Sequence, residues 1–375
     1  MMKLILKVRC LWNRLKAILQ RHNRMAIIFL IGSFSLICSC EKADLSQAKP
    51  NENLRPAADF LKNNYEFKIM YAAFEHAGMV EELNSEGPLT VLAVSDEGFR
   101  LNGIQSVQQI KKMNKDSVKM MMAYHVLKNR RLLSTDIPTN AVDSRYETLG
   151  GDAIYTSAVN SLKRFYFDGA GTIRTDVQLS NGVMHVLNKM MKFQKNTKVQ
   201  EFIARNPNYS IFVAGLKKFK LWDELAKDGL YTVFVPNNKT FEDNGITLET
   251  VANWKAESYH NRLFNSYIMY GKHYFISDKY IFLHVASENY YNYTIKDDTW
   301  YLRFSQNENR GNNAIYPVID LMKTVPGRPF PDLIKNSSFN SNNSNSADFD
   351  YRLEDGIVHE VNQLFVLPSQ AILTN

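Results

Sequence analysis

The sequence predicts an α+β protein that contains two copies of one unit. Residues 67–99 return without a gap as residues 209–241, and apolar side chains recur in both at the spacing of one face of an amphipathic helix. In both copies a short apolar run follows, residues 90–94 and 232–236, which is typical of a buried strand. Helix followed by strand, twice in one register, indicates duplicated domains of layered α+β architecture.

The remaining elements of the first copy follow from local signals. A glycine after each predicted helix, Gly87 and Gly229, suits a left-handed helix stop. Ser106 is the predicted cap of one short helix and Asp116 of the next. The Asp168-Gly169 pair between two later apolar runs predicts a tight hairpin.

The positive charge of the chain belongs to its N-terminal segment. The first 39 residues carry seven Lys or Arg side chains and no acid, while the whole chain has a formal net charge of +7. The rest of the chain is therefore neutral, which argues against a nucleic-acid partner, because such a partner requires a basic folded surface.

Residues 25–37 form an uncharged run that ends near Cys40. The run is shorter than the roughly 20 apolar residues of a membrane-spanning helix, and it fits the core of a signal peptide. The segment 36–40 resembles the bacterial lipobox, which implies cleavage before Cys40 and lipid attachment to its thiol. We expect residues 1–39 to be a lipoprotein signal peptide, with the start at either Met1 or Met25, and residues 40–53 to be a flexible tether. An ordinary secreted protein is the alternative.

All three cysteines lie at or before position 40, so the predicted domains have no thiol. Disulfides, a thiolate nucleophile and cysteine zinc ligands are excluded there. The sequence also lacks a His-Glu-x-x-His motif, a Gly-x-Ser-x-Gly motif and a Walker loop. We predict no catalytic, cofactor or metal site, and hence no enzyme.

Three further stretches carry a family resemblance. Residues 90–99, 124–127 and 181–188 resemble the first signature, the central Tyr-His segment and the closing signature of the fasciclin domain. Residues 232–241 and 355–362 repeat the first and last of these. The resemblance implies two tandem domains, at residues 54–195 and 196–368, each a β-sandwich or wedge of about seven strands with flanking helices.

The second domain is longer than the first. We assign much of the difference to an Asn/Ser-rich insertion near residues 336–347, whose composition favours a disordered loop.

Three histidines stand out in the signatures. His185 and His359 occupy matching places in the closing strands, and His125 lies in the Tyr-His segment, where Ile268 is aligned with it in the second copy. A histidine can serve as a general base, but on the apolar face of a strand its ring more often bonds to the backbone. We predict structural roles for all three.

Candidate ligand contacts come from two places. Tyr290, Trp300 and Tyr301 belong to a cluster of aromatic residues, although the alternation of Trp300, Leu302 and Phe304 is also typical of a strand that faces the core. By resemblance, Asp176 and Val177 match an Asp-Ile pair with which animal fasciclin domains are thought to contact integrins.

We therefore expect a non-catalytic, lipid-anchored adhesion or ligand-binding protein of a Gram-negative bacterium of the Bacteroidota type. It would be held in the outer membrane and face outward, or else the periplasm, and it would bind a cell-surface or extracellular protein or glycan. The alternatives are a glycan-binding subunit of a polysaccharide capture or uptake complex, a polysaccharide-active enzyme built on Asp297-Asp298 or Asp348 and Asp350, and a structural spacer. Because both aspartate pairs lie in stretches typical of turns or disorder, we expect them to be solvated turn residues.

Overall fold

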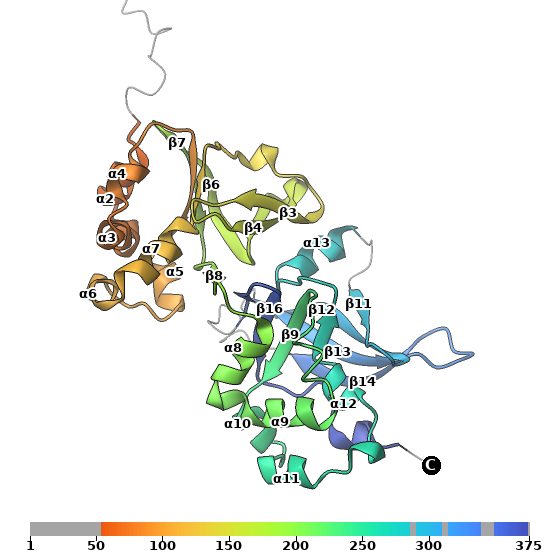
Figure 1. Ribbon diagram of the computed structural model, residues 1–375. Helices are drawn as coiled ribbons and strands as arrows, with labels where there is room; N and C mark the ends of the chain where they lie inside the picture. The colour runs from red at the N-terminus through yellow and green to blue at the C-terminus, as the bar shows by residue number, and fades with distance from the viewer. Residues whose placement is uncertain (1–53, 286–289, 310–313, 339–348, 374–375) are drawn as a thin grey trace, which may run out of the picture. The chain divides into compact units, whose positions relative to one another are not determined.

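The computed structural model describes residues 54–285, 290–309, 314–338 and 349–373 (Figure 1). Residues 54–375 form one compact unit. This unit contains two large hydrophobic cores, one built from residues between Ala57 and Met191 and the other from residues between Val199 and Ala371. We call the parts around these cores domain 1 and domain 2.

The helices of domain 1 lie together along one side of its strands (Figure 1). They are α2 (Ala57–Lys62), α3 (Lys68–Ala77), α4 (Val80–Leu83), α5 (Asp96–Leu101), α6 (Val107–Lys112) and α7 (Lys115–Ala123). The side chain of Ser106 caps α6 as predicted, whereas α7 is capped by Asn114 and not by Asp116. The side-chain oxygen of Asn114 accepts the N–H of Ser117, which has no partner within the helix, so the helix begins earlier than expected.

The helix stop predicted at Gly87 lies elsewhere. Helix α3 ends at Gly78, which has a φ of 71°, and a second short helix follows before the strand. Gly87 serves a different purpose, because a Cβ at this position would lie 1.9 Å from the backbone oxygen of Asn181. Close approach of two backbones therefore requires this glycine, and a left-handed turn does not.

Domain 1 contains one mixed sheet of seven strands in the order β2-β1-β7-β6-β5-β4-β3. The strands are β1 (Leu89–Val94), β2 (Val126–Lys128), β3 (Ala141–Glu147), β4 (Ala153–Val159), β5 (Arg164–Phe167), β6 (Ala170–Leu179) and β7 (Gly182–Leu187). Strands β1 and β7 pair in parallel, and the other neighbours are antiparallel. The hairpin predicted at Asp168-Gly169 is confirmed, since both residues have positive φ and connect β5 to β6.

Domain 2 repeats the helices and divides its strands between two sheets. Its helices are α8 (Val199–Arg205), α9 (Ser210–Lys218), α10 (Asn238–Glu242), α11 (Leu248–Asn253), α12 (Arg262–Asn265) and α13 (Asp278–Val285). One sheet has the order β10 (Ile268–Tyr270), β9 (Tyr231–Pro236), β16 (Gly356–Val361), β15 (Tyr351–Arg352) and β8 (Lys192–Phe193). The other has the order β11 (Tyr291–Thr294), β12 (Trp300–Asn309), β13 (Ala314–Lys323) and β14 (Asp332–Ser338).

The two domains share an internal hydrogen bond on their equivalent first strands. The Thr90 hydroxyl on β1 donates to the backbone oxygen of Arg130 at 2.8 Å. On β9, the Thr232 hydroxyl donates to the backbone oxygen of Lys272 at 2.9 Å. Donor and acceptor are separated by the same number of residues in both domains, so these bonds mark equivalent positions.

The insertion of domain 2 differs from its prediction. Asn336 and Ser337 belong to strand β14, and Ser337 faces inward with its hydroxyl donating to the backbone oxygen of Leu364 at 3.3 Å. The polar composition predicted a loop here. Successive side chains of a strand point to opposite faces, however, so Asn336 is exposed while Ser337 is buried with its hydroxyl hydrogen-bonded. The remainder, residues 339–348, lies outside the described residues.

The segment that connects the two cores belongs to the five-stranded sheet of domain 2. Strand β8 was assigned to the first domain from sequence, yet it pairs in parallel with β15. The backbone N–H of Gln194 continues the pairing by donating to the oxygen of Arg352 at 2.9 Å. Helix α13 of domain 2 packs in turn against β4 of domain 1.

Candidate functional site

Strand β12 separates the predicted aromatic contacts onto two faces. Trp300, Leu302 and Phe304 point inward and are 9 %, 0 % and 2 % exposed. The guanidinium of Arg262 covers the Trp300 ring, at 4.0 Å from the ring centroid. Trp300 is therefore a core residue, and its prediction as a ligand contact is wrong.

Tyr290 and Tyr301 flank an arginine on the opposite face. The guanidinium carbon of Arg303 lies 4.0 Å from the Tyr290 ring centroid and 5.9 Å from that of Tyr301. Arg303 also donates to the Tyr301 hydroxyl at 3.2 Å and to the Asn292 side chain at 3.3 Å. All but Asn292 are half-buried. Two partly open rings fixed beside a cation can stack on a flat group of a ligand.

A row of polar side chains extends this face across the sheet. Arg303 is opposite Asn292 on β11 and opposite Asp320 on β13, and Asp320 is opposite Asn336 on β14. The Asn336 amide donates to Asp320 at 2.7 Å, and burial raises the pKa of Asp320 above its ordinary value. We name these residues together the Arg303 surface: Tyr290, Asn292, Tyr301, Arg303, Asp320 and Asn336. The sequence identified only its tyrosines, because the register of four strands was needed to bring the others together.

Asp176 and Val177 lie in domain 1, apart from the Arg303 surface. The Asp176 carboxylate accepts the backbone N–H of Ser134 at 2.8 Å and also the Ser134 hydroxyl, which fixes the short 3-10 helix Ser134–Asp136. Val177 packs against the first core. Both residues are half-buried, so the geometry shows how they hold the loop in place.

The second domain has an equivalent of Asp176 that the sequence alone did not reveal. Asp350 has a φ of 62°, close to the 57° of Asp176. Its carboxylate accepts the backbone N–H of Ile276 at 3.0 Å, and its own N–H donates to His359 at 3.1 Å. Asp176 donates in the same way to His185. The equivalence was hidden because the insertion changes the offset between the two copies.

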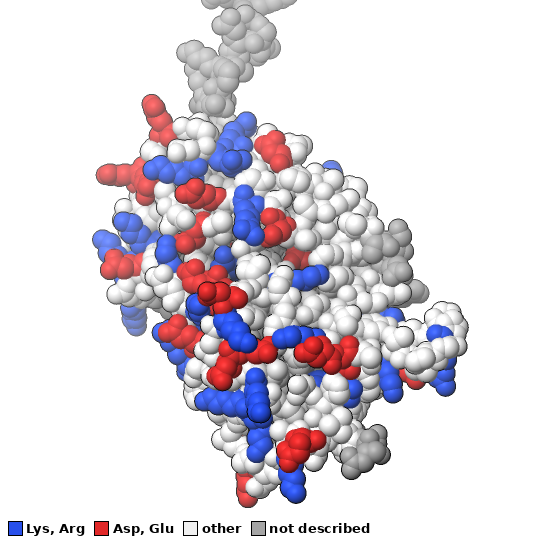
Figure 2. All heavy atoms as spheres, turned by 45° about the vertical axis from the view of Figure 1, so that its right-hand side comes forward, with Lys and Arg blue, Asp and Glu red and all other residues white. Residues whose placement is uncertain are grey.

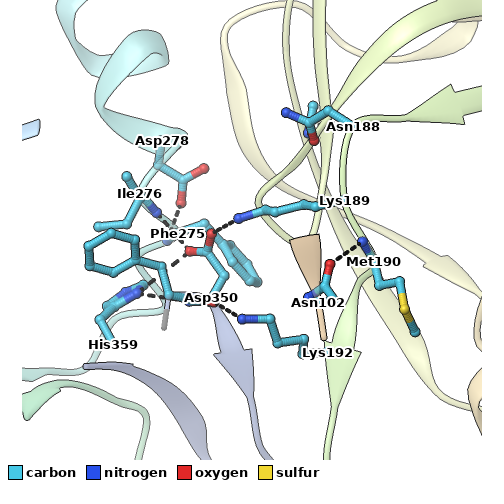
Figure 3. A network of polar contacts seen from close by, with 12 residues as sticks. Asn102, Asn188, Lys189, Met190, Lys192, Phe275, Ile276, Asp278, Asp350 and His359 are labelled. Carbon is cyan, nitrogen blue, oxygen red and sulfur yellow. Dashed lines mark hydrogen bonds and ion pairs between the residues drawn. The ribbon is translucent and has the colours of Figure 1, made fainter. Parts of the chain in front are cut away.

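Asp350 is buried where the two domains meet (Figure 3). The ammonium of Lys189 from domain 1 lies 2.5 Å from its carboxylate, and Lys192 donates to the backbone oxygen of Phe349 at 2.7 Å. Burial opposes the charge, but the ammonium of Lys189, together with the backbone N–H of Ile276, outweighs it and holds the pKa of Asp350 below its ordinary value. The interpretation of Asp350 as a solvated turn residue is therefore wrong.

Asp278 forms a second buried link between the domains. Ser157 of domain 1 donates its hydroxyl to the Asp278 carboxylate at 2.9 Å, and the backbone N–H of Phe275 donates to the other oxygen at 2.9 Å. Burial raises the pKa of Asp278 to about 8. This contact could not be predicted from the sequence, because it depends on which surfaces of the two domains face each other.

Asp298, the second residue of the Asp297-Asp298 pair, is also committed to structure. Asp298 is bonded by Arg262 at 2.6 Å and by the backbone N–H of Thr299 at 2.7 Å, and its side chain is 1 % exposed. The prediction of a solvated turn residue is therefore wrong for Asp298. Among the described residues, no group of three or more His, Cys, Asp or Glu side chains is placed to hold a metal ion.

The histidines of the closing strands bond to the backbone on both sides of the ring. His185 bonds to the oxygen of Leu132 at 2.8 Å, and His359 bonds to that of Tyr274 at 2.8 Å. Burial lowers the pKa of both, to about 4 for His359. A neutral ring with both nitrogens engaged serves structure.

His125 has a counterpart in domain 2, but it is Tyr267 and not Ile268. One ring nitrogen of His125 bonds to the oxygen of Met121 at 2.9 Å, and the other accepts the N–H of Met191 at 3.2 Å. The Tyr267 hydroxyl accepts the N–H of Phe365 at 2.8 Å at the equivalent place. The sequence alignment was one residue out, because the histidine and tyrosine perform one task with different chemistry.

The proposed lipid-attachment residue, Cys40, lies outside the described residues, as do the predicted signal peptide and tether. In the part of the chain that the structure describes, we find no helix with the length and apolar character to span a membrane. On the face that Figure 2 shows, basic and acidic side chains are interspersed. That face therefore offers no broad patch of one sign.

Comparison with known proteins identifies the repeated unit. The fasciclin domain matches twice, at residues 65–193 and 207–368. Protein sll1483 of Synechocystis is 26 % identical over 152 residues, which are 40 % of this chain and 81 % of that protein. Human periostin is 27 % identical over 165 residues, 43 % of this chain and 19 % of periostin. The matched region is thus a small part of that animal protein.

One solved structure similar to this chain is the FAS1 domain pair from the insect cell adhesion molecule fasciclin I. It is 16 % identical and covers 81 % of this chain and 99 % of its own, with a TM-score of 0.34.

Proposed function

Because this chain belongs to the fasciclin domain family and carries two such domains in tandem, we propose that it is a non-catalytic adhesion protein displayed by a lipid anchor. Fasciclin domains are typically adhesion or binding modules, and they bind extracellular proteins. The proposal for this chain is that domain 2 binds an extracellular protein through the Arg303 surface.

The observation that carries this proposal is the Tyr290, Arg303 and Tyr301 arrangement. Aromatic and arginine side chains supply most of the binding energy at many protein interfaces. Here the cation is already oriented between the rings, so little side-chain freedom is lost on binding.

The anchor is proposed from the lipobox-like segment before Cys40. Several acyl chains on one cysteine would hold the protein stably in the outer membrane of a bacterium of the Bacteroidota type. Residues 41–53 would then let the domains face outward, and many anchored copies would bind a surface together even if each contact is weak.

Binding of the purified protein to a panel of immobilised extracellular proteins tests the contact. We expect Arg303→Ala to weaken binding to the recognised protein by about tenfold, since truncation of a central interface side chain commonly has this effect. Arg328→Ala is the matched control, because Arg328 is a largely exposed arginine that pairs with Asp332 at the start of β14. Equal loss in both variants, or no loss in either, would refute the assignment of the Arg303 surface.

A glycan partner is the second candidate, and the polar row favours it. The Asn336 amide and the Asp320 carboxylate can exchange hydrogen bonds with sugar hydroxyls while Tyr301 stacks on a ring. A glycan array distinguishes the two candidates. Strong sugar binding that is lost in Asp320→Ala and Tyr301→Ala would make the protein a glycan-capture subunit. Polysaccharide turnover lost in Asp297→Asn would instead indicate an enzyme.

Orientation is tested on intact cells with added proteinase. We expect the domains to be digested in cells that carry the lipid anchor. Cys40→Ala is the control that removes the acylated residue, and it should release the protein from the membrane fraction. Full protection of the anchored protein would place it on the periplasmic side.

A further inference from the structure

Domain 1 contains a groove that is separate from the Arg303 surface. An apolar slot lined by Leu83, Leu89 and Val126 adjoins a wider pocket of about 420 Å³. The two share the residues Met79, Glu82, Lys128, Asn129 and Leu149. We name this combined hollow the β2 groove, because strand β2 forms one of its walls.

In domain 2 the equivalent space is filled by aromatic side chains of the chain itself. Leu89 and Lys128 are paired across β1 and β2, and Tyr231 and Tyr270 take the same places across β9 and β10. The two tyrosine rings meet edge to face, with centroids 6.0 Å apart. The Tyr231 hydroxyl donates to the backbone oxygen of Glu224 at 2.9 Å. The fold is thus compatible with a filled site, and domain 1 leaves it open.

A lysine completes the filled version of the site. The Lys296 ammonium lies 4.6 Å from the Tyr270 ring centroid and 2.8 Å from the Glu224 carboxylate. Glu224 stands where Glu82 stands in domain 1, because the two residues precede strands β9 and β1 by the same number of residues. Within the described residues the Glu82 carboxylate makes no ion pair, so the acid is present in domain 1 without its cation.

Acids outnumber bases by one around the β2 groove, which favours a cationic occupant over an anionic one. Its lining contains three acids, Glu82, Glu86 and Glu147, and two bases, Lys119 and Lys128. All five are exposed, so their side chains can rearrange around an incoming group.

We propose that the β2 groove is a docking site for a protein segment that presents an aromatic side chain next to a lysine or arginine. The aromatic ring would enter beside Leu89, as Tyr231 does in domain 2, and the cation would pair with Glu82, as Lys296 does with Glu224. The site is a second contact on the first domain, and it does not depend on the Arg303 surface.

The test uses the full-length protein in neutral detergent micelles and a fluorescein-labelled peptide of alternating lysine and tyrosine. Fluorescence anisotropy should rise and saturate with protein concentration. A peptide in which glutamate replaces lysine, and another in which alanine replaces tyrosine, should bind at least severalfold more weakly, because each lacks one half of the recognised pair.

Three variants locate the binding. Leu89→Tyr introduces the residue that fills the site in domain 2 and should abolish binding. Lys128→Tyr introduces the other tyrosine of domain 2 at an exposed position and should also abolish binding. It replaces Leu89→Tyr in the test if that variant does not fold. Glu82→Gln should weaken binding about threefold, as expected for one exposed ion pair. Asp143→Asn is the matched control, since it removes an exposed acid of the same domain outside the groove.

Three results would overturn the proposal. The first is an anisotropy that does not saturate with the lysine-tyrosine peptide. The second is equal binding by the wild type, Leu89→Tyr and Lys128→Tyr. The third is competition by tyramine at the same concentration as the peptide, which would make the groove a site for a small aromatic amine.

Discussion

Asp176 and Asp350 occupy one place in the two domains, yet their surroundings differ. In domain 1 the second carboxylate oxygen is bonded by the hydroxyl of Ser134. In domain 2 the equivalent residue is Ile276, which has no hydroxyl, and the ammonium of Lys189 lies at the carboxylate instead. The carboxylate that fixes a loop within domain 1 therefore belongs, in domain 2, to a contact between the domains.

Asp350→Asn should destabilise the protein strongly. The variant leaves Lys189 with 13 % exposure and without its counter-charge, and loss of one partner of a buried pair typically costs about 3–5 kcal/mol. Asp176→Asn is the matched control and should cost about 1 kcal/mol, as for an ordinary hydrogen bond. Urea unfolding of both variants at pH 7 measures the difference. Equal costs would show that Lys189 does not stabilise the domain contact.

His125 makes stability depend on pH. Burial lowers its pKa in the folded protein to about 4, below the ordinary value of 6.5. The unfolded chain therefore binds more protons between these values, and the stability contributed by the neutral ring is lost as pH falls from about 6.5 to about 4.

His125→Tyr, which introduces the residue of domain 2, should reduce this dependence. Between pH 7 and pH 5 the variant should lose about 2 kcal/mol less unfolding free energy than the wild type. His359 has a similarly lowered pKa and should retain its own share of the dependence in both proteins. Identical pH profiles for wild type and variant would contradict the buried, neutral state of His125.

At the scale of elements, the periodicity of apolar residues predicted the strands and their faces better than single capping and stop residues predicted the helix ends. The apolar runs at β1 and β9 are fully buried strands, and the alternation along β12 separates its two faces as predicted. The helix stop at Gly87 and the cap at Asp116 were wrong, because several residues nearby satisfy the same local rule. The pairing that aligns Arg303 with Asp320 was out of reach, since strand register depends on contacts between distant segments.

Strand β12 offers a direct test of its two faces. Trp300→Ala should cost about 3–5 kcal/mol, the usual range for removal of a large buried aromatic side chain. Tyr301→Ala, at the neighbouring half-buried position, should cost no more than about 1 kcal/mol. Thermal unfolding of the two variants gives the comparison. A larger loss for Tyr301→Ala would mean that the strand is turned the other way.

At the scale of the whole molecule, two cores are joined by a contact that uses charge as well as apolar surface. Tyr155, Phe275 and Ile357 form a small apolar cluster, next to the ion pair of Lys189 with Asp350. Strand β8 also links the domains, because it follows the first core in the chain and pairs with β15 at the edge of the five-stranded sheet of domain 2. The sequence revealed the duplication but not this contact, since neither copy alone contains the surface that covers Asp350.

Attachment of intact cells is the most direct test of the proposed adhesion function. Cells that carry the wild-type protein, at matched surface density, should attach to a layer of the extracellular protein recognised in the binding panel. Cells that carry Arg303→Ala should lose most of that attachment, while Arg328→Ala cells should keep it. Attachment by Arg303→Ala cells at the wild-type level would contradict the proposal that this chain is an adhesion protein acting through domain 2.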